Sequence, residues 1–182
     1  MALSKILPAS QEQYAGSRNL IINGAMQVAQ RGTSATGIGN GGFITDRFFY
    51  DRSGLGITAV FDSSQASDAP DGFQYSAKLD CTTAQTLGAS GGTYLGIRHK
   101  IEGYNVSHLT QNSFTLSFYV KSTKTGTFSV VLKNSGEDRF YCAEYTVSTS
   151  DTWERKNIQI NAIPSAGTWN FTNGVGLDIF WC

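Results

Sequence analysis

Residues 113–122 alternate apolar and polar side chains without a break, which is the period of a β-strand with one buried face. The side chains expected to point inward are Phe114, Leu116, Phe118 and Val120. The side chains expected to point outward are Thr115, Ser117, Tyr119 and Lys121. This is the strongest strand pattern in the chain. It predicts a sheet, because the backbone groups of a strand must pair with those of neighbouring strands.

The same period recurs along most of the sequence, with turn signals every ~8–12 residues. We predict strands at residues 43–50, 57–62, 75–81, 94–101, 128–133, 139–147, 153–160 and 175–182. Loops rich in Gly, Ser and Thr are expected at 32–42, 63–72 and 82–92, and 105–111 has room for one short helix. Helices do not alternate with strands, so the prediction is an all-β, antiparallel β-sandwich.

The first 34 residues contain two separate signals. Residues 1–18 have no clear period, so we expect a short N-terminal arm, either a loose terminus or an anchor that orders on another subunit. Residues 19–34 are predicted to form a strand, a tight turn at Asn23-Gly24 and a second strand. The sandwich is therefore expected to cover 19–182. Because the sequence stops within a predicted strand, we expect it to be the N-terminal part of a longer chain.

Composition argues against several classes of function. Charged residues make up 15% of the 182 residues and the formal net charge is zero, so a basic footprint for nucleic acid or a membrane surface is absent. No apolar run approaches the ~20 residues of a membrane-spanning helix. The opening residues 1–8 are too short for a secretory hydrophobic region, so synthesis in the cytosol is expected. The three cysteines are far apart in sequence and are predicted to be buried, reduced thiols.

Catalytic and metal-binding patterns are weak. His99 falls on the apolar face of its predicted strand, where a core histidine is the expected role. The glycines between 37 and 42 match a dinucleotide-binding spacing but lack the strand before and the helix after. Asp46-Arg47 and Asp138-Arg139 are typical of turn or strand-end charges. We predict no enzyme, no metal site and no cofactor, and no acidic run supports a structural calcium ion.

Outward positions of several predicted strands carry aromatic and charged side chains. These are the chemistries that bind sugars, in which an aromatic ring covers the pyranose and polar groups meet its hydroxyls. If their strands are neighbours, one sheet face would bring together a candidate carbohydrate-binding set: Tyr94, Arg98, Tyr119, Asp178 and Phe180. The alternative is a purely structural role, in which such aromatics fill the core and the contacts between subunits. An outward Phe180 favours burial against a partner chain.

Four stretches resemble a known family. NLIINGAMQVAQRGTS (19–34) followed by FITDRFF (43–49) is similar to the start of the jelly-roll domain in phage tail-fibre and virion structural proteins. SFTLSFYVKSTKTGTFSVVL (113–132) and EYTVSTSDTWERKNIQI (144–160) resemble both that group and carbohydrate-binding modules of cellulase-type enzymes. Val28-Ala29 stand where the pattern has a tryptophan.

The resemblance implies a jelly-roll fold and a place in a bacteriophage virion, in a tail fibre or related surface appendage that this domain attaches to the particle. Other virion proteins of the tail or capsid would then be its partners, and fibres of this kind are commonly homotrimers. Two alternatives stay open: a carbohydrate-binding module for a host surface glycan, and a capsid decoration or knob protein of the same fold.

Overall fold

The computed structural model describes residues 19–53, 58–86, 94–110 and 112–182. Four predictions lie wholly or partly outside this range: the arm at 1–18, residue 57 of a strand, residues 87–92 of a loop and residue 111 of the short helical stretch. The strands in chain order are β1 (Ser34–Ala35), β2 (Phe43–Thr45), β3 (Phe48–Ser53), β4 (Val60–Ala66), β5 (Ser76–Thr83), β6 (Tyr94–Glu102), β7 (Phe114–Val120), β8 (Gly126–Asn134), β9 (Phe140–Val147), β10 (Glu154–Ile160) and β11 (Val175–Trp181). Two short 3-10 turns, η1 (Gly103–Asn105) and η2 (Ser107–Thr110), follow β6 where the short helix was predicted.

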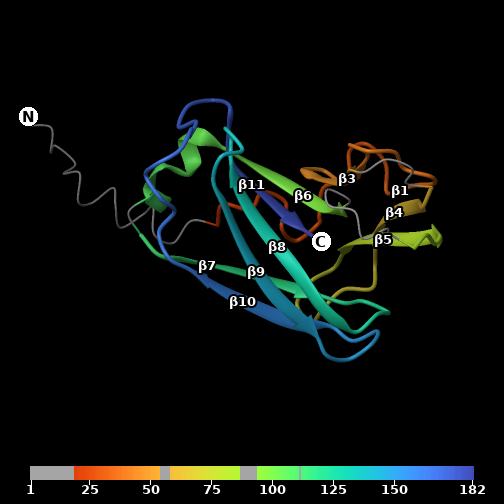
Figure 1. Cartoon of the computed structure of the whole chain (residues 1–182). Helices are drawn as coiled ribbons and strands as arrows, with labels where there is room; N and C mark the ends of the chain where they lie inside the picture. The colour runs from red at the N-terminus through yellow and green to blue at the C-terminus, as the bar shows by residue number, and fades with distance from the viewer. Residues whose placement is uncertain (1–18, 54–57, 87–93, 111) are drawn as a thin grey trace, which may run out of the picture.

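The largest sheet has six strands in the order β2-β3-β6-β11-β8-β9, and every neighbouring pair is antiparallel. Two smaller sheets, β1-β4-β5 and β10-β7, are also antiparallel. In Figure 1 the β7–β10 pair lies beneath the β8–β9 end of the large sheet, and β1, β4 and β5 lie at the opposite end. The all-β, antiparallel prediction is confirmed, and the jelly-roll connectivity stays a prediction.

Both small sheets pack on the same face of the six-stranded sheet, which we call its inner face. One core cluster lies between the β7–β10 pair and the large sheet. In it, Leu116 of β7 and Ile160 of β10 pack against three residues of the large sheet: Ile101, Leu132 and Ile179. A second cluster packs residues of β4 and β5 against β2, β3 and β6: its members include Phe61, Leu79, Ile44, Tyr50 and Ile97. The alternation predicted for β6 and β7 is confirmed, because the residues of these strands that pack in the clusters are all predicted inward ones: Leu95, Ile97, Ile101, Phe114, Leu116 and Phe118.

The opening segment is not the predicted strand-turn-strand. Residues 22–25 form a turn, and the residues on either side of it are irregular. Here side chains provide the hydrogen bonds that a neighbouring strand would otherwise provide. The Asn23 amide donates to the carbonyls of Val28 (2.9 Å) and Asp46 (2.8 Å), and the Gln30 N–H donates to the Asp46 carboxylate (2.6 Å). Since buried or half-buried backbone groups need partners from some source, these bonds fix an irregular segment across β2.

The strand predicted at 43–50 is a hairpin. Phe43 pairs with Phe49 and Thr45 with Phe48, so the chain reverses at Asp46-Arg47, the pair whose charges were predicted for a turn or strand end. Arg47 has a φ of 75°. Its guanidinium donates to the carbonyl of Lys100 (3.0 Å) and to Glu102 (2.5 Å), which offsets the cost of that backbone conformation.

Strand β4 continues four residues into the predicted loop at 63–72. Ser63 is buried and the Gln65 N–H donates to the carbonyl of Thr33 at 2.8 Å, while Ser64 lies opposite Ser34 of β1. A run of neutral polar residues predicts a loop when it is considered alone. Here these residues form a strand, because their backbone groups pair with neighbouring strands.

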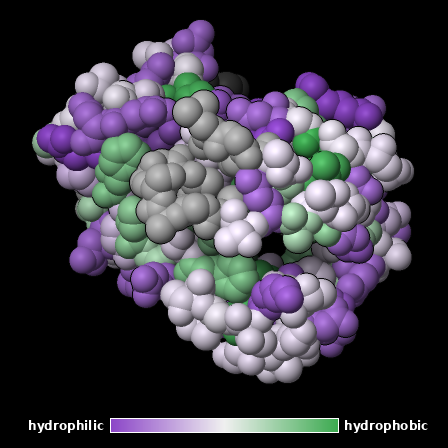
Figure 2. All heavy atoms as spheres, turned by 45° about the vertical axis from the view of Figure 1, so that its right-hand side comes forward, coloured by the Kyte–Doolittle hydropathy of each residue, from purple (hydrophilic) through white to green (hydrophobic). Residues whose placement is uncertain are grey.

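The three cysteines are free, as predicted, but they are not buried. Cys81 and Cys142 are exposed and Cys182 is half-buried. Cys142 alternates with Ala143 along β9 and therefore points away from the core. The side of the molecule seen in Figure 2 is mostly hydrophilic or near the middle of the hydropathy scale, with hydrophobic residues gathered in a few patches.

His99 is a core histidine, as predicted, and it is fully buried beside Phe48, with ring centroids 4.7 Å apart. Neither ring nitrogen has a hydrogen-bond partner in the described part of the chain. Burial first, and the charge of Arg47 second, lowers the pKa of His99 from 6.5 to about 4.

Folding stability should therefore depend on pH between these two values. From 6.5 down to about 4 the unfolded chain binds a proton at His99 that the folded chain does not, so the free energy of unfolding falls as the pH falls. The full loss from this group is about 3 kcal/mol, and His99→Leu should remove it. Urea unfolding of both proteins at several pH values measures this; equal pH slopes for the two would contradict it.

Candidate binding face

The opposite face of the six-stranded sheet, which we call the outer face, is defined by strand register. Phe49 lies opposite Arg98, Arg98 opposite Phe180, and Phe180 opposite Val131, so all four share one side. The same registers add the other members of the outer face: Phe43, Asp51, Ser53, Tyr94, Gly96, Lys100, Thr127, Ser129, Lys133, Phe140, Cys142, Glu144, Thr146 and Asp178. In the described residues both small sheets pack on the inner face and not on this one.

Four of the five predicted site residues meet on the outer face. Tyr94 and Arg98 come from β6, and Asp178 and Phe180 come from the adjacent β11. Tyr119 does not join them, because β7 pairs with β10 in a separate sheet. There its ring packs edge-on against Phe73 at 5.7 Å. Alternation predicted correctly that Tyr119 points outward, but it could not predict to which sheet β7 belongs.

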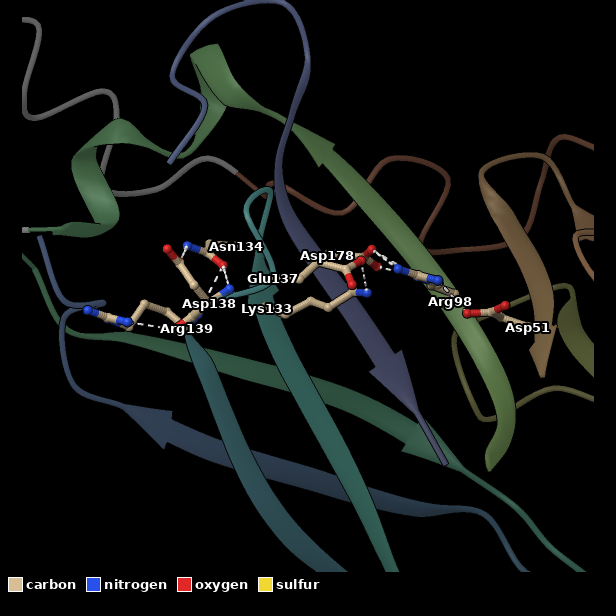
Figure 3. A network of polar contacts seen from close by, with 8 residues as sticks. All are labelled: Asp51, Arg98, Lys133, Asn134, Glu137, Asp138, Arg139 and Asp178. Atoms are coloured by element: carbon tan, nitrogen blue, oxygen red, sulfur yellow. Dashed lines mark hydrogen bonds and ion pairs between the residues drawn. The ribbon is translucent and has the colours of Figure 1, made fainter. Parts of the chain in front are cut away.

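An ion cluster of Asp51, Arg98 and Asp178 occupies the middle of the outer face (Figure 3). The Nε of Arg98 donates to both carboxylate oxygens of Asp178 at 2.8 Å, its Nη2 donates to the same carboxylate, and its Nη1 donates to Asp51. The Asp178 residue is 3% exposed and Asp51 is 7% exposed. We refer to these three residues as the Asp–Arg–Asp cluster.

The cluster pairs two carboxylates with one guanidinium and keeps a net charge of −1. Burial acts to lower the pKa of Arg98, but its hydrogen bonds and charge contacts with Asp178 and Asp51 outweigh burial and raise that pKa above the ordinary value. A planar guanidinium can meet two carboxylates at once, which a lysine cannot do in the same way. The donors of Arg98 are thereby engaged within the chain.

A second polar group stands beside the first, where β8 turns into β9. Asn134 is 1% exposed; its amide donates to Asp138, and its carbonyl accepts from the N–H of Arg139 at 3.1 Å. Asp138 also accepts from the N–H and hydroxyl of Thr168. The bond from Asn134, followed by those from Thr168, holds the pKa of Asp138 below its usual range. Figure 3 shows this group next to the Lys133–Glu137 ion pair.

Sequence reasoning missed Asp51 and Asn134. Asp51 had an available signal, because it occupies an outward position of its strand and carries the charge opposite to that of Arg98. What the sequence lacked was the knowledge that β3 and β6 are neighbours. The Asn134 amide donates to the carbonyl of Thr168, which lies thirty-four residues further along the chain, and no local pattern predicts that contact.

The aromatic residues of the outer face divide into covered and exposed ones. Phe180 is 9% exposed and packs edge-on against Tyr94 at 5.1 Å, so its burial does not require the partner chain that was predicted from its outward position. Tyr94 is 38% exposed and Phe140 is 60% exposed. Lys100 lies 5.3 Å from the centre of the Phe49 ring, a cation–π distance.

This arrangement limits what the predicted sugar-binding set can contact. Arg98 and Asp178 are bound to each other, and Phe180 is covered, so Tyr94 is the member of the four that offers substantial area to a ligand. In the described residues, groups of three or more His, Cys, Asp or Glu side chains placed to hold a metal ion are not found. The helical turns described here are too short to cross a membrane.

A scan against protein-family models finds no match, and a search of curated proteins finds none either.

Proposed function

We propose that this chain is a structural protein of a bacteriophage virion, in a tail fibre or related surface appendage, and that it attaches to neighbouring virion proteins through the outer face. The support for the virion setting is the resemblance of residues 19–34, 43–49 and 113–132 to the jelly-roll domain of such proteins. The support for the outer face is its chemistry, which follows.

The observation that carries this proposal is the hydrogen-bonded Asp–Arg–Asp cluster in the centre of the outer face, where one guanidinium binds both carboxylates. Both carboxylates of the Asp–Arg–Asp cluster already bind the guanidinium within the chain, so each would keep its hydrogen bonds when a partner covers the cluster, which carries a net charge of −1. Around it stand exposed Tyr94, Phe140 and Cys142. Aromatic residues with few free charges are typical of the core of a protein–protein interface.

The proposed role is binding and not catalysis. A pair of carboxylates is the feature that glycoside hydrolysis requires. In that reaction one carboxylic acid protonates the leaving group, and a second carboxylate acts as base or nucleophile on the opposite face of the sugar ring. Here both carboxylates of the cluster accept hydrogen bonds from the same guanidinium, so Arg98 stands between them, where that reaction needs the glycosidic bond.

Antibody labelling of phage particles tests the proposal. An antibody to this chain should decorate a tail appendage in electron micrographs of particles whose genome encodes it. Particles assembled with Tyr94→Asp should lose that label, because a charge is placed in the proposed interface. Tyr104→Asp is the matched control, since Tyr104 is 70% exposed on η1, outside the six-stranded sheet. Label on the head would favour a decoration or knob protein, and unlabelled wild-type particles would refute the virion role.

A second candidate function, binding of a host surface glycan, is favoured by the Tyr94 ring standing exposed beside Phe180 on a sheet face. Titration of the chain with a panel of bacterial surface glycans, followed by NMR, separates the two functions. Shifts centred on Tyr94 that disappear in Tyr94→Ala would support the glycan. Unchanged spectra across the panel would leave the structural role.

A further inference from the structure

Strand β9 is an open edge of the six-stranded sheet. It stands last in the strand order, and its ladder partner in the described residues is β8 alone. Outside that ladder, backbone hydrogen bonds from residues 140–147 are not found in the described chain. Five of its eight residues are exposed, among them Phe140, Tyr141 and Cys142. A free strand edge presents unpaired N–H and C=O groups, which can pair with another strand.

The other strand edges carry protective features that β9 lacks. β2, at the far end of the same sheet, has three residues, and the segment beside it contacts it: the Val28 carbonyl accepts from the Asp46 N–H, and Arg31 lies over the Phe43 ring. β5 carries the Lys78–Asp80 ion pair, and β10 begins with Glu154-Arg155-Lys156. β7 ends where Tyr119 contacts Phe73. Charges, short length and cover are the ordinary means of blocking edge pairing.

β9 is also regular in its pairing and almost uncharged. The β8–β9 ladder runs through eight pairs without a register shift, whereas the β2–β3, β4–β5 and β6–β11 ladders each contain one. Its sequence, FYCAEYTV, has no proline, glycine or basic residue, and Glu144 is its single charge. A regular strand of this composition is well suited to continuous backbone pairing.

We infer that β9 pairs antiparallel with β9 of a second copy of this chain, which makes one continuous sheet across a two-fold axis. The strand is complementary to itself. With Ala143 opposite Ala143 of the second copy, Tyr141 lies opposite Tyr145 and Glu144 lies opposite Cys142, so the two carboxylates do not face each other. The formal net charge of zero leaves no long-range repulsion between copies. Each chain has one β9, so the pairing closes as a dimer.

The pairing concerns the edge of the sheet, and it does not rest on the virion role proposed for the outer face. Sedimentation velocity of the full chain over a wide concentration range should give a monomer–dimer equilibrium. Cys142→Glu should raise the dissociation constant about tenfold or more, because it places a new carboxylate opposite Glu144 of the second copy. Cys81→Glu is the matched control, the same exchange at an exposed thiol of β5, and should leave the equilibrium unchanged.

Thiol cross-linking identifies the strand directly. A chain that keeps Cys142 as its one cysteine should form a covalent dimer with a short bis-maleimide, and a chain that keeps Cys81 instead should not. A monomer at every concentration, a trimer, a dimer unaffected by Cys142→Glu, or a cross-link as strong at Cys81 as at Cys142 would each overturn the inference.

Discussion

Arg98→Met should lower the free energy of unfolding by about 3–5 kcal/mol, which is the usual cost of removing one partner from a buried ion pair. The substitution keeps the length of the aliphatic stem but removes the guanidinium. Asp51 and Asp178 then remain as two buried carboxylates without their counter-ion, close enough that one guanidinium had bridged them. Urea unfolding at neutral pH measures the loss.

Two variants separate the charge from the packing. The triple variant Asp51→Asn, Arg98→Met, Asp178→Asn removes all three charges together and should recover much of the lost stability, because uncharged replacements of a buried ion cluster are often close to neutral. Arg98→Lys should fall between wild type and Arg98→Met, since an ammonium cannot reproduce the fork that meets both carboxylates. If Arg98→Met unfolds like wild type, the cluster is not the structural centre of the outer face.

Gly96→Ala is the second large effect. Gly96 lies on β6 where the end of β11 passes, and a Cβ atom there would stand 1.9 Å from the carbonyl oxygen of Trp181 and 3.1 Å from the Cα of Cys182. These are backbone atoms of a paired strand, so they cannot move aside without breaking the β6–β11 ladder. We expect a loss of about 3 kcal/mol or more, at the upper end for overpacking.

Gly39→Ala is the control for this substitution. Gly39 has no other atom within 4 Å of its Cβ position and no positive φ, so the change should stay within about 0.5 kcal/mol of wild type. Thermal unfolding of both variants provides the comparison. A stable Gly96→Ala protein with an intact β6–β11 pairing would mean that the two strands lie farther apart than described here.

The sequence predicted the faces of individual strands well and the partners of those strands poorly. The period of two in β6, β7 and β11 depends on local side-chain geometry, which the sequence contains. That β11 lies between β6 and β8 depends on packing between residues about 50 to 80 positions apart, as in the register of Phe180 with Arg98 and Val131. Asp51 was therefore missed, and Tyr119 was placed on the wrong sheet.

The errors near the N-terminus have a different cause. Apolar residues before Asn23-Gly24 were predicted as a strand, but the Asn23 and Asp46 side chains satisfy that backbone without a ladder. In β4 the reverse occurs, because Ser63, Ser64 and Gln65 have turn-like composition and yet pair as a strand. In both places, contacts with residues distant in the sequence decide the backbone conformation, against the local strand or turn propensity.

A cryo-EM map of the intact phage particle, at a resolution that shows side chains, tests the central claim most directly. The proposed attachment requires density of a neighbouring virion protein over the outer face, in contact with Tyr94 and Phe140 and above the Asp–Arg–Asp cluster. A map in which this chain is present in the particle while its outer face stands open to solvent would contradict the account.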